Sequence, residues 1–283
     1  MHGHFSLTGE CCIRRIRILI RMWVAGTPDL MNSPRCSYLT HPGYLRSGNE
    51  DSILVPGTVI NVTGMERAEL MEVSALPALF MVADGIGGAV HGEVASRTVL
   101  EYCSQVQVPA TPEAVTTMIA GAKEALDRFV RADPSYTGFG TTVAGVVLFS
   151  DHALIFNCGD SRVYRINEGD AERLSHDHSL VQELCDSGAI TSDQMYTHQY
   201  RNIITASVSG DPTRPTPPVL VSRVSRQENS RFLICTDGVW EVIRDDTIFS
   251  LCSTGDLRSA ADAVLKACLA GGGPDNISLI LIG

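Results

Sequence analysis

The chain has 283 residues, of which 44% are apolar and 19% are charged, so it can bury a sizeable core. Its formal net charge of −10 argues against nucleic acid as the main partner, because phosphate backbones are bound by basic surfaces. The nine cysteines are odd in number and form no C-x-x-C pair. This pattern argues against a disulfide framework or a zinc site and indicates a reducing cytoplasm.

Residues 1–36 differ in character from the rest of the chain, and we expect them to form a leader outside the folded domain. We expect this leader to be disordered, or not to be translated if Met31 is the true start. The alternative is a surface membrane anchor, because a helix here would carry Arg14, Arg17 and Arg21 on one stripe and Ile13, Ile16, Ile20 and Trp23 on another. Because Arg21 interrupts the longest apolar run, we expect no transmembrane segment.

Short segments rich in branched or aromatic residues predict a domain with many strands. These segments are Ile53–Val55, Leu79–Val82, Thr142–Phe149, His152–Asn157, Arg162–Ile166, Val219–Val224, Arg231–Cys235 and Ile277–Ile282. The tight turn from Phe149 to His152 joins two of them, which predicts antiparallel neighbours.

Three helices are predicted together with their ends. Thr111-Pro112 supplies an N-cap and a first-turn proline for a helix that runs to about Arg131. Apolar residues at helical spacing from Leu257 to Cys268 predict a second helix, which Gly271 ends. The third is expected over Glu93 to Ser104.

Two longer excursions leave the predicted scaffold. Pro56 to Pro77 lies between two strands and contains a stretch with helical spacing, Met65 to Val73. Ser175 to Ser209 contains a predicted helix from Ser179 to Ser187, and we expect His176-Asp177-His178 to be exposed residues near its start rather than metal ligands. Excursions of this size near a site usually serve recognition.

Three separated motifs each place an aspartate beside a glycine or an amide: Asp84-Gly85-Ile86-Gly87-Gly88, Thr236-Asp237-Gly238 and Pro274-Asp275-Asn276. Each motif alone is an ordinary turn sequence. Together they supply carboxylates and exposed carbonyls, the hard oxygen donors that suit Mg²⁺ or Mn²⁺.

An arginine and further acids accompany these motifs. Arg46 stands shortly before Glu50 and Asp51, and Asp160 follows another predicted strand. The planar guanidinium matches the geometry of a phosphate group. Several carboxylates around one arginine therefore predict a site that binds divalent metals and a phosphate ester.

The order of these motifs resembles that of the PP2C-type (PPM) metal-dependent protein phosphatases, in their bacterial branch. The resemblance extends from about Tyr38 to the last residue. Its blocks are RSGNED at 46–51, VADGIGGAVHGEVAS at 82–96, GFGTT at 138–142, NCGDSRVYRI at 157–166, CTDGVWE at 235–241 and GPDNISLILI at 273–282. One block alone is a weak signal, whereas their joint occurrence in order is strong.

The resemblance implies an α+β fold, a four-layer α-β-β-α sandwich of two antiparallel sheets flanked by helices. It assigns 37–283 to the phosphatase domain and makes 175–209 a flap beside the active site. The metals are expected at one end, between the sheets.

The resemblance also implies the role of each site residue, with two Mn²⁺ or Mg²⁺ as cofactors and a third metal position in bacterial members. In this assignment Asp84 bridges both metals, the Gly85 carbonyl binds one of them, and Asp237 and Asp275 hold the other. Asp51 and Glu50 act through metal-bound waters, and Asp160 belongs to the third metal position. Arg46 binds the phosphate. The water shared by the metals attacks phosphorus. Position 86 is isoleucine, where many eukaryotic members have a histidine, so we make His91 the candidate acid for the leaving group.

These features predict a cytoplasmic, monomeric phosphatase that acts on phosphoserine and phosphothreonine in proteins and opposes a bacterial Ser/Thr kinase. One rival is a pseudophosphatase that binds phosphoproteins without turnover; the retained Asp84, Asp237 and Asp275 argue against it. Another is a relative that acts on anti-sigma-factor antagonists. Such relatives lack the flap, which this chain is expected to have.

Overall fold

The computed structural model describes Met1 and residues 33–87, 91–167, 169–227 and 229–283. A compact unit begins at Pro34, three residues before the predicted start of the domain at 37. Most of the predicted leader, with the alternative of a membrane anchor, and Gly88 of the first aspartate motif lie outside the described residues.

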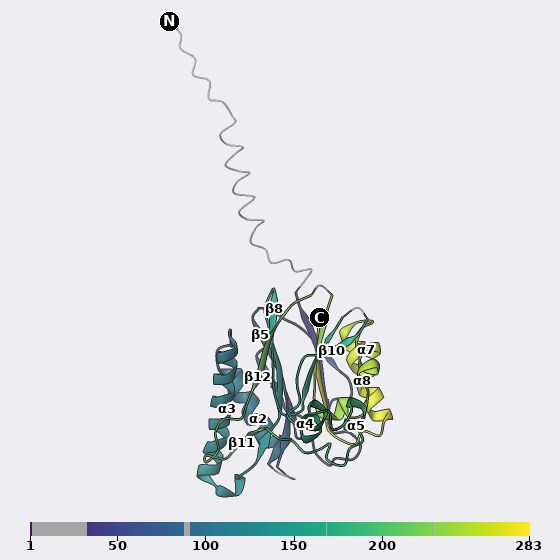
Figure 1. Ribbon diagram of the computed structural model, residues 1–283. Helices are drawn as coiled ribbons and strands as arrows, with labels where there is room; N and C mark the ends of the chain where they lie inside the picture. The colour runs from purple at the N-terminus through teal and green to yellow at the C-terminus, as the bar shows by residue number, and fades with distance from the viewer. Residues whose placement is uncertain (2–32, 88–90, 168, 228) are drawn as a thin grey trace. The chain divides into compact units, whose positions relative to one another are not determined.

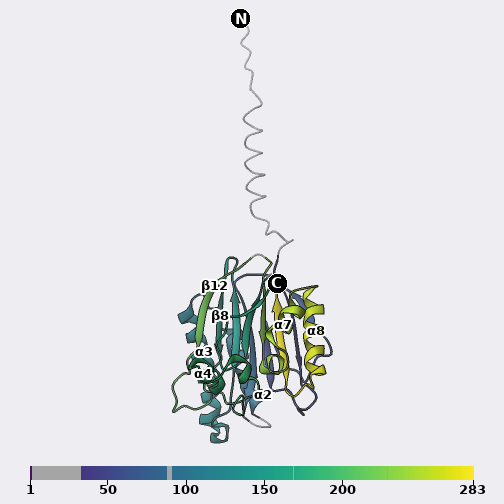
Figure 2. The same cartoon turned by 45° about the vertical axis from the view of Figure 1, so that its right-hand side comes forward.

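Two antiparallel sheets face each other in this unit (Figure 1, Figure 2). The six-stranded sheet has the order β10-β9-β13-β14-β1-β4. Its strands are β1 (Arg35–His41), β4 (Glu69–Glu72), β9 (Arg162–Ile166), β10 (Ala171–Arg173), β13 (Arg231–Cys235) and β14 (Ile277–Ile282). The turn from Phe149 to His152 joins β7 and β8 of the other sheet as antiparallel neighbours, as predicted.

The eight-stranded sheet has the order β11-β6-β5-β7-β8-β12, with β2 paired to β5 and β3 paired to β2. Its strands are β2 (Asp51–Val55), β3 (Thr58–Ile60), β5 (Ala78–Ile86), β6 (Gly140–Thr141), β7 (Val143–Leu148), β8 (His152–Cys158), β11 (Val208–Ser209) and β12 (Leu220–Ser225).

Helices cover the outer face of each sheet, which confirms the predicted α-β-β-α sandwich. The pair α2 (Gly92–Gln105) and α3 (Pro112–Ala132) packs on the eight-stranded sheet, and α7 (Asp245–Cys252) and α8 (Leu257–Ala270) pack on the other. A third apolar cluster fills the space between the sheets. The other helices among the described residues are η2 (Pro134–Tyr136), α4 (Leu180–Asp186), α5 (Ser192–Met195) and α6 (Asp237–Trp240).

The helix ends follow the predicted local chemistry. The Thr111 side chain accepts a hydrogen bond from the Ala114 amide at 3.2 Å and so satisfies one free N–H group at the start of α3. Gly271 is the C-cap of α8, as its position after the last apolar residue predicts. Among the described residues, none of the helices combines the length and hydrophobicity that crossing a bilayer requires.

The predicted helix over Met65 to Val73 is wrong. Glu69–Glu72 forms the edge strand β4 and pairs antiparallel with β1, and the Met65 amide donates to the Thr40 carbonyl at 2.8 Å. Helical spacing in a short segment cannot compete with a neighbouring strand that satisfies its backbone groups.

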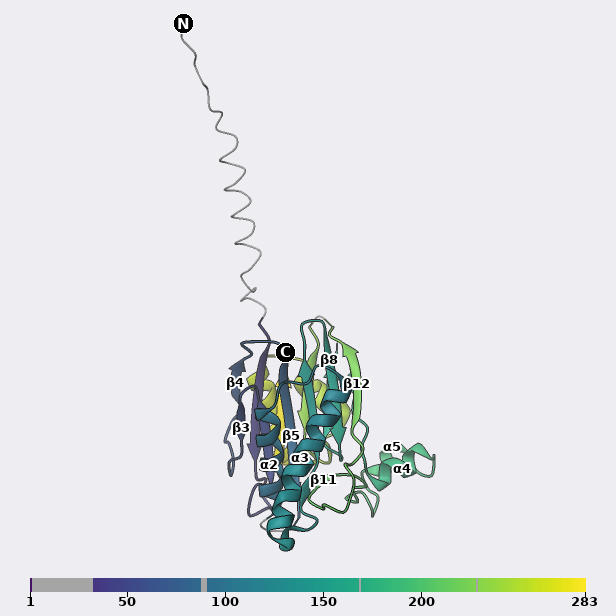
Figure 3. The ribbon, with the colours of Figure 1, turned by 90° about the vertical axis from the view of Figure 1, so that its left-hand side faces the viewer.

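The segment 175–209 carries α4 and α5, which stand away from the sandwich in Figure 3. Ser179 caps α4 as predicted, since its hydroxyl accepts from the Gln182 amide at 3.3 Å. An isolated bridge between Ser179 and Ile204 closes the segment at its base. The segment therefore forms a loop-like projection whose two ends meet at the sandwich. Projections of this kind often bind partners or substrates.

Candidate metal and phosphate site

Strand pairing brings two of the predicted acids together. Asp51 begins β2 and lies directly opposite Asp84 on β5, in a register that continues through Leu54 and Met81. The Thr236 hydroxyl donates to Asp51 Oδ2 at 2.9 Å, so the residue before Asp237 contacts the same carboxylate. Three motifs that are far apart in sequence therefore meet at this end of the sheets.

The loop with Arg46 lies against the loop with Asp275. Arg46 Nη2 donates to Asp275 Oδ2 at 2.6 Å, although the arginine side chain is 54% exposed. Asn276 fastens both loops, because its side chain donates to the carbonyls of Pro42 and Gly48 and accepts from the Glu50 amide at 2.8 Å. The predicted phosphate ligand thus lies beside a predicted metal ligand.

Two glycines of the motifs allow the backbone to approach closely. A Cβ atom on Gly85 would lie 2.2 Å from the Gly92 carbonyl oxygen, and one on Gly238 would lie 2.0 Å from the Asn276 carbonyl oxygen. Both distances are too short for any side chain, so glycine is required at these positions. The close packing holds the segments that carry Asp84 and Asp237 in place.

The acids raise each other's pKa, which shows that they share one electrostatic environment. Burial and then the charge of Asp237 raise the pKa of Asp84 well above its usual value. Burial and then the charges of Asp160 and Asp275 do the same for the pKa of Asp237. For Asp51, burial is again the largest cause and raises the pKa to about 7. The carboxylates of Asp51, Asp84 and Asp237 therefore lie near enough for their charges to interact, while their role as metal ligands stays a prediction.

The donor chemistry of this cluster suits a hard divalent cation. The buried Oδ1 atoms of Asp51 and Asp160 have no hydrogen-bond partner. Buried carboxylate oxygens normally have partners, so these two are available as ligands. Within the described ranges, no three His, Cys, Asp or Glu side chains are arranged so that they could hold a metal ion as they stand. Arg46 and Thr236 occupy one oxygen each of Asp275 and Asp51, so cation binding requires these side chains to adjust.

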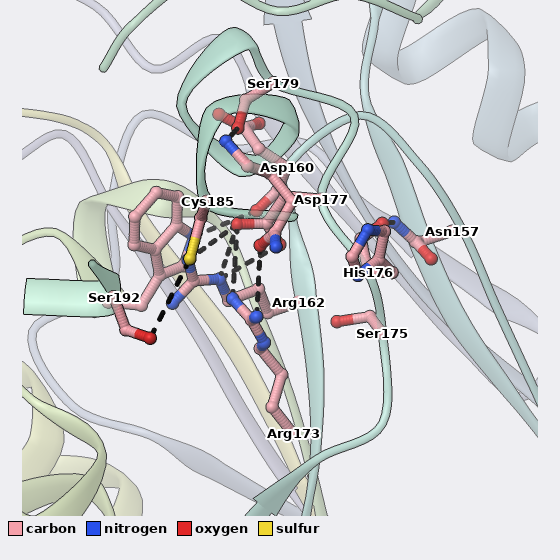
Figure 4. A network of polar contacts seen from close by, with 12 residues as sticks. Asn157, Asp160, Arg162, Arg173, Ser175, His176, Asp177, Ser179, Cys185 and Ser192 are labelled. Carbon is pink, nitrogen blue, oxygen red and sulfur yellow. Dashed lines mark hydrogen bonds and ion pairs between the residues drawn. The ribbon is translucent and has the colours of Figure 1, made fainter. Parts of the chain in front are cut away.

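Asp160 is connected to the base of the flap through a buried polar network (Figure 4). The Trp240 indole donates to the Asp160 carbonyl oxygen at 3.0 Å, and its ring lies 3.6 Å from the Arg162 guanidinium carbon. Arg162 in turn pairs with Asp177 at 2.6 Å, and the two side chains are 1% and 0% exposed. The expectation that Asp177 is an exposed flap residue is therefore wrong, because it neutralises a buried arginine.

His91 lies next to the N-terminus of α2, and its ring lies 4.4 Å from that of Tyr136, measured between centroids. Gly87 of the first aspartate motif is close by, since a Cβ atom there would be 3.6 Å from His91 Cβ. The histidine is thus near the end of β5 that carries Asp84. Its role as an acid stays a prediction.

The sequence did not reveal the contacts of three residues that organise the site. Thr236 and Trp240 bond to Asp51 and Asp160, and Asn276 connects two loops through hydrogen bonds to the carbonyls of Pro42 and Gly48. Thr236 and Trp240 flank Asp237 within the CTDGVWE block, but their partners Asp51 and Asp160 are far away in sequence. The block marks the residues as notable, whereas only the fold identifies what they contact.

The chain matches a family model and known bacterial proteins. The model described as protein phosphatase 2C matches residues 70–270. Serine/threonine protein phosphatase PstP of Mycobacterium tuberculosis is 27% identical over 243 residues, which cover 84% of this chain and 43% of that protein. Serine/threonine phosphatase stp of Listeria monocytogenes is 25% identical over 213 residues, covering 72% of this chain and 83% of the relative.

Solved structures show the same fold. The crystal structure of the M. tuberculosis phosphatase PstP/Ppp gives a TM-score of 0.73 at 25% identity and covers 89% of this chain and 98% of that one. Stp1 from Staphylococcus aureus gives a TM-score of 0.72 at 27% identity, covering 88% and 94%. This chain therefore spans a whole solved domain but only 43% of the full mycobacterial protein. With the family model matched over most of its length, the chain belongs to the protein phosphatase 2C family.

Proposed function

We propose that the chain is a metal-dependent phosphatase that hydrolyses phosphoserine and phosphothreonine in proteins. The observation that carries this proposal is the convergence of aspartates from separate motifs beside the exposed Arg46. Divalent cations would neutralise these neighbouring carboxylates, and the arginine then offers a site for an anion. The relatives named as Ser/Thr phosphatases support the choice of substrate class.

Asp84, the Gly85 carbonyl, Asp237 and Asp275 would hold two divalent cations, with Glu50 and Asp51 around them. The catalytic domain of PstP has been crystallised with two manganese ions. When bound, such a pair lowers the pKa of water and neutralises charge on the phosphate. Arg46 lies at the rim of the cluster, where its guanidinium can exchange Asp275 for phosphate oxygens and orient the ester.

Two roles complete the proposed mechanism. Asp160 would contribute to a third cation position, which its unpartnered Oδ1 and its effect on Asp237 support. His91 would supply the proton to the leaving group, supported by its place near Gly87 at the end of β5. Histidine is the side chain that most often serves as a general acid or base in enzymes.

We further propose a monomer in a reducing cytoplasm, working against a Ser/Thr kinase on the same phosphoproteins. The seven cysteines that the structure describes are free thiols, which supports a reducing compartment. A phosphatase of protein substrates needs a kinase to supply them.

Manganese should raise the melting temperature of the purified protein by about 5 to 10 °C at a concentration 100 times its dissociation constant. The reason is that the cations relieve repulsion between the buried aspartates. Differential scanning calorimetry with manganese and with EDTA measures the shift, and elemental analysis counts the bound ions. Asp160→Ala should lose one ion and keep a shift. A melting temperature that manganese leaves unchanged would contradict the metal site.

Arg46→Ala should lower kcat/KM for a phosphothreonine peptide about 10- to 100-fold, because a charge-assisted contact to the phosphate is lost. The manganese-induced rise in melting temperature should persist, since no metal ligand is removed. Steady-state kinetics and calorimetry give the two results. Arg97→Ala, which removes an exposed arginine of α2, serves as the matched control. Equal loss of activity and of manganese binding would argue against a role in binding phosphate.

A further inference from the structure

Large apolar side chains are exposed directly before Arg46 and in the flap. Tyr44 and Leu45, directly before Arg46, are 66% and 74% exposed. In the flap, Tyr200 and Ile203 are 45% and 44% exposed and stand on either side of Arg201. We call these four residues the apolar rim. Each pair is therefore next to an arginine in sequence, Arg46 or Arg201.

The first pair is held in solvent by a rigid turn. Gly43 has φ +74°, and a Cβ atom there would lie 2.3 Å from the Asp275 carbonyl oxygen. The Tyr44 amide donates to the Gly273 carbonyl at 2.8 Å. The backbone of this turn is thus fixed against the loop that carries Asp275, so the exposure of Leu45 does not come from a loose segment. Apolar groups that a well-packed backbone presents to water commonly mark binding surfaces.

The second pair lies in the part of the flap whose backbone is attached next to Asp160. The Ile203 carbonyl accepts from the Leu180 amide at 2.9 Å, and the Thr205 amide donates to the His178 carbonyl at 2.8 Å. The His178 amide in turn donates to the carbonyl of Gly159 at 2.9 Å, directly before Asp160. The backbone that carries Ile203 is therefore connected by hydrogen bonds to the residue before a proposed metal ligand.

We propose that the apolar rim binds bulky apolar side chains next to the phosphorylated residue of the substrate. The preferred substrate is then a phosphopeptide segment with aliphatic or aromatic neighbours. This inference rests on the proposed function, because Arg46 places the phosphate and the rim receives what flanks it. Continuity with the phosphate position favours a substrate over a second copy of the chain.

The test uses two phosphothreonine peptides that are identical except for leucine or serine on both sides of the phosphothreonine. The wild-type protein should hydrolyse the leucine peptide with a kcat/KM about fivefold higher, since partial burial of a leucine contributes to transition-state binding. In Leu45→Ser and in Ile203→Ser the ratio should fall toward one. Leu220→Ser is the matched control, because Leu220 is 40% exposed on the edge strand β12, and it should keep the wild-type ratio.

Equilibrium binding of the same peptides, labelled with fluorescein, separates the rim from catalysis. The wild-type protein should bind the leucine peptide more tightly, and Leu45→Ser should remove that preference. If neither peptide is hydrolysed but this preference is found, the proposed hydrolysis is refuted, whereas binding of apolar flanking side chains by the apolar rim is supported. Equal kcat/KM values and equal affinities for both peptides in the wild type would refute the proposed role of the apolar rim. So would a preference for the leucine peptide that Leu45→Ser leaves unchanged. A changed oligomeric state of Leu45→Ser with an unchanged ratio would also overturn it and assign the surface to a second copy.

Discussion

Asp237→Asn should lower kcat for hydrolysis of a phosphothreonine peptide in the presence of manganese by about three orders of magnitude. Asp237 begins α6, and its charge is among the main causes of the raised pKa of Asp84. An amide in its place removes a negative charge from the proposed cation ligands without changing the size of the side chain. Single-turnover measurements at saturating manganese determine the loss in the chemical step.

The matched control for this variant is Asp170→Asn, which removes one negative charge from an exposed turn between β9 and β10. It should retain wild-type turnover, because long-range charge in solvent is screened. Equal turnover in Asp237→Asn and the wild type would refute the assignment of Asp237.

Asp177→Asn should lower the free energy of unfolding by about 3 to 5 kcal/mol. Arg162 donates to both oxygens of Asp177 from Nε at 3.1 and 3.0 Å, and both side chains are buried. Without the carboxylate, the guanidinium stays buried next to Tyr164 and Trp240 and has lost its ion-pair partner. Urea denaturation monitored by circular dichroism measures the change.

The control for the buried pair is an exposed one. Arg131 and Glu124 form an ion pair in α3 in which each side chain is 51% exposed, and Glu124→Ala should leave the midpoint of urea denaturation nearly unchanged. If Asp177→Asn changed the midpoint of urea denaturation as little as Glu124→Ala does, the ion pair between Arg162 and Asp177 would contribute little to stability. The expected order of the two variants follows from desolvation, because water can solvate Arg131 after Glu124 is removed but cannot reach the buried Arg162.

Local patterns predicted the buried strands and the capped helices well. The bounds of β9, β13 and β14 agree with the predicted ranges, because short segments rich in branched or aromatic residues favour strands. The helical spacing of Met65 to Val73 predicts a helix where the structure has β4. The strand forms because it pairs with β1, and this partner is remote in sequence. A short amphipathic segment takes its structure from such a partner, which local spacing does not reveal.

The candidate site shows the same division. The motifs marked Asp84, Asp237 and Asp275, since carboxylates beside glycines have a recognisable chemistry. What the sequence could not show is the register that places Asp51 opposite Asp84, or the burial of Asp177 against Arg162. Both depend on contacts between residues that are separated along the chain, and local pattern contains no information on such pairs.

The most direct test of the account is phosphate release from a phosphothreonine peptide by the wild-type protein, measured with EDTA and then after manganese is restored. We expect no release above background with EDTA, because the aspartates alone offer no means to activate water or to neutralise the phosphate. Manganese should restore release. Hydrolysis that continues unchanged in EDTA, or that is absent with saturating manganese, would contradict the claim that this acid cluster works through bound cations.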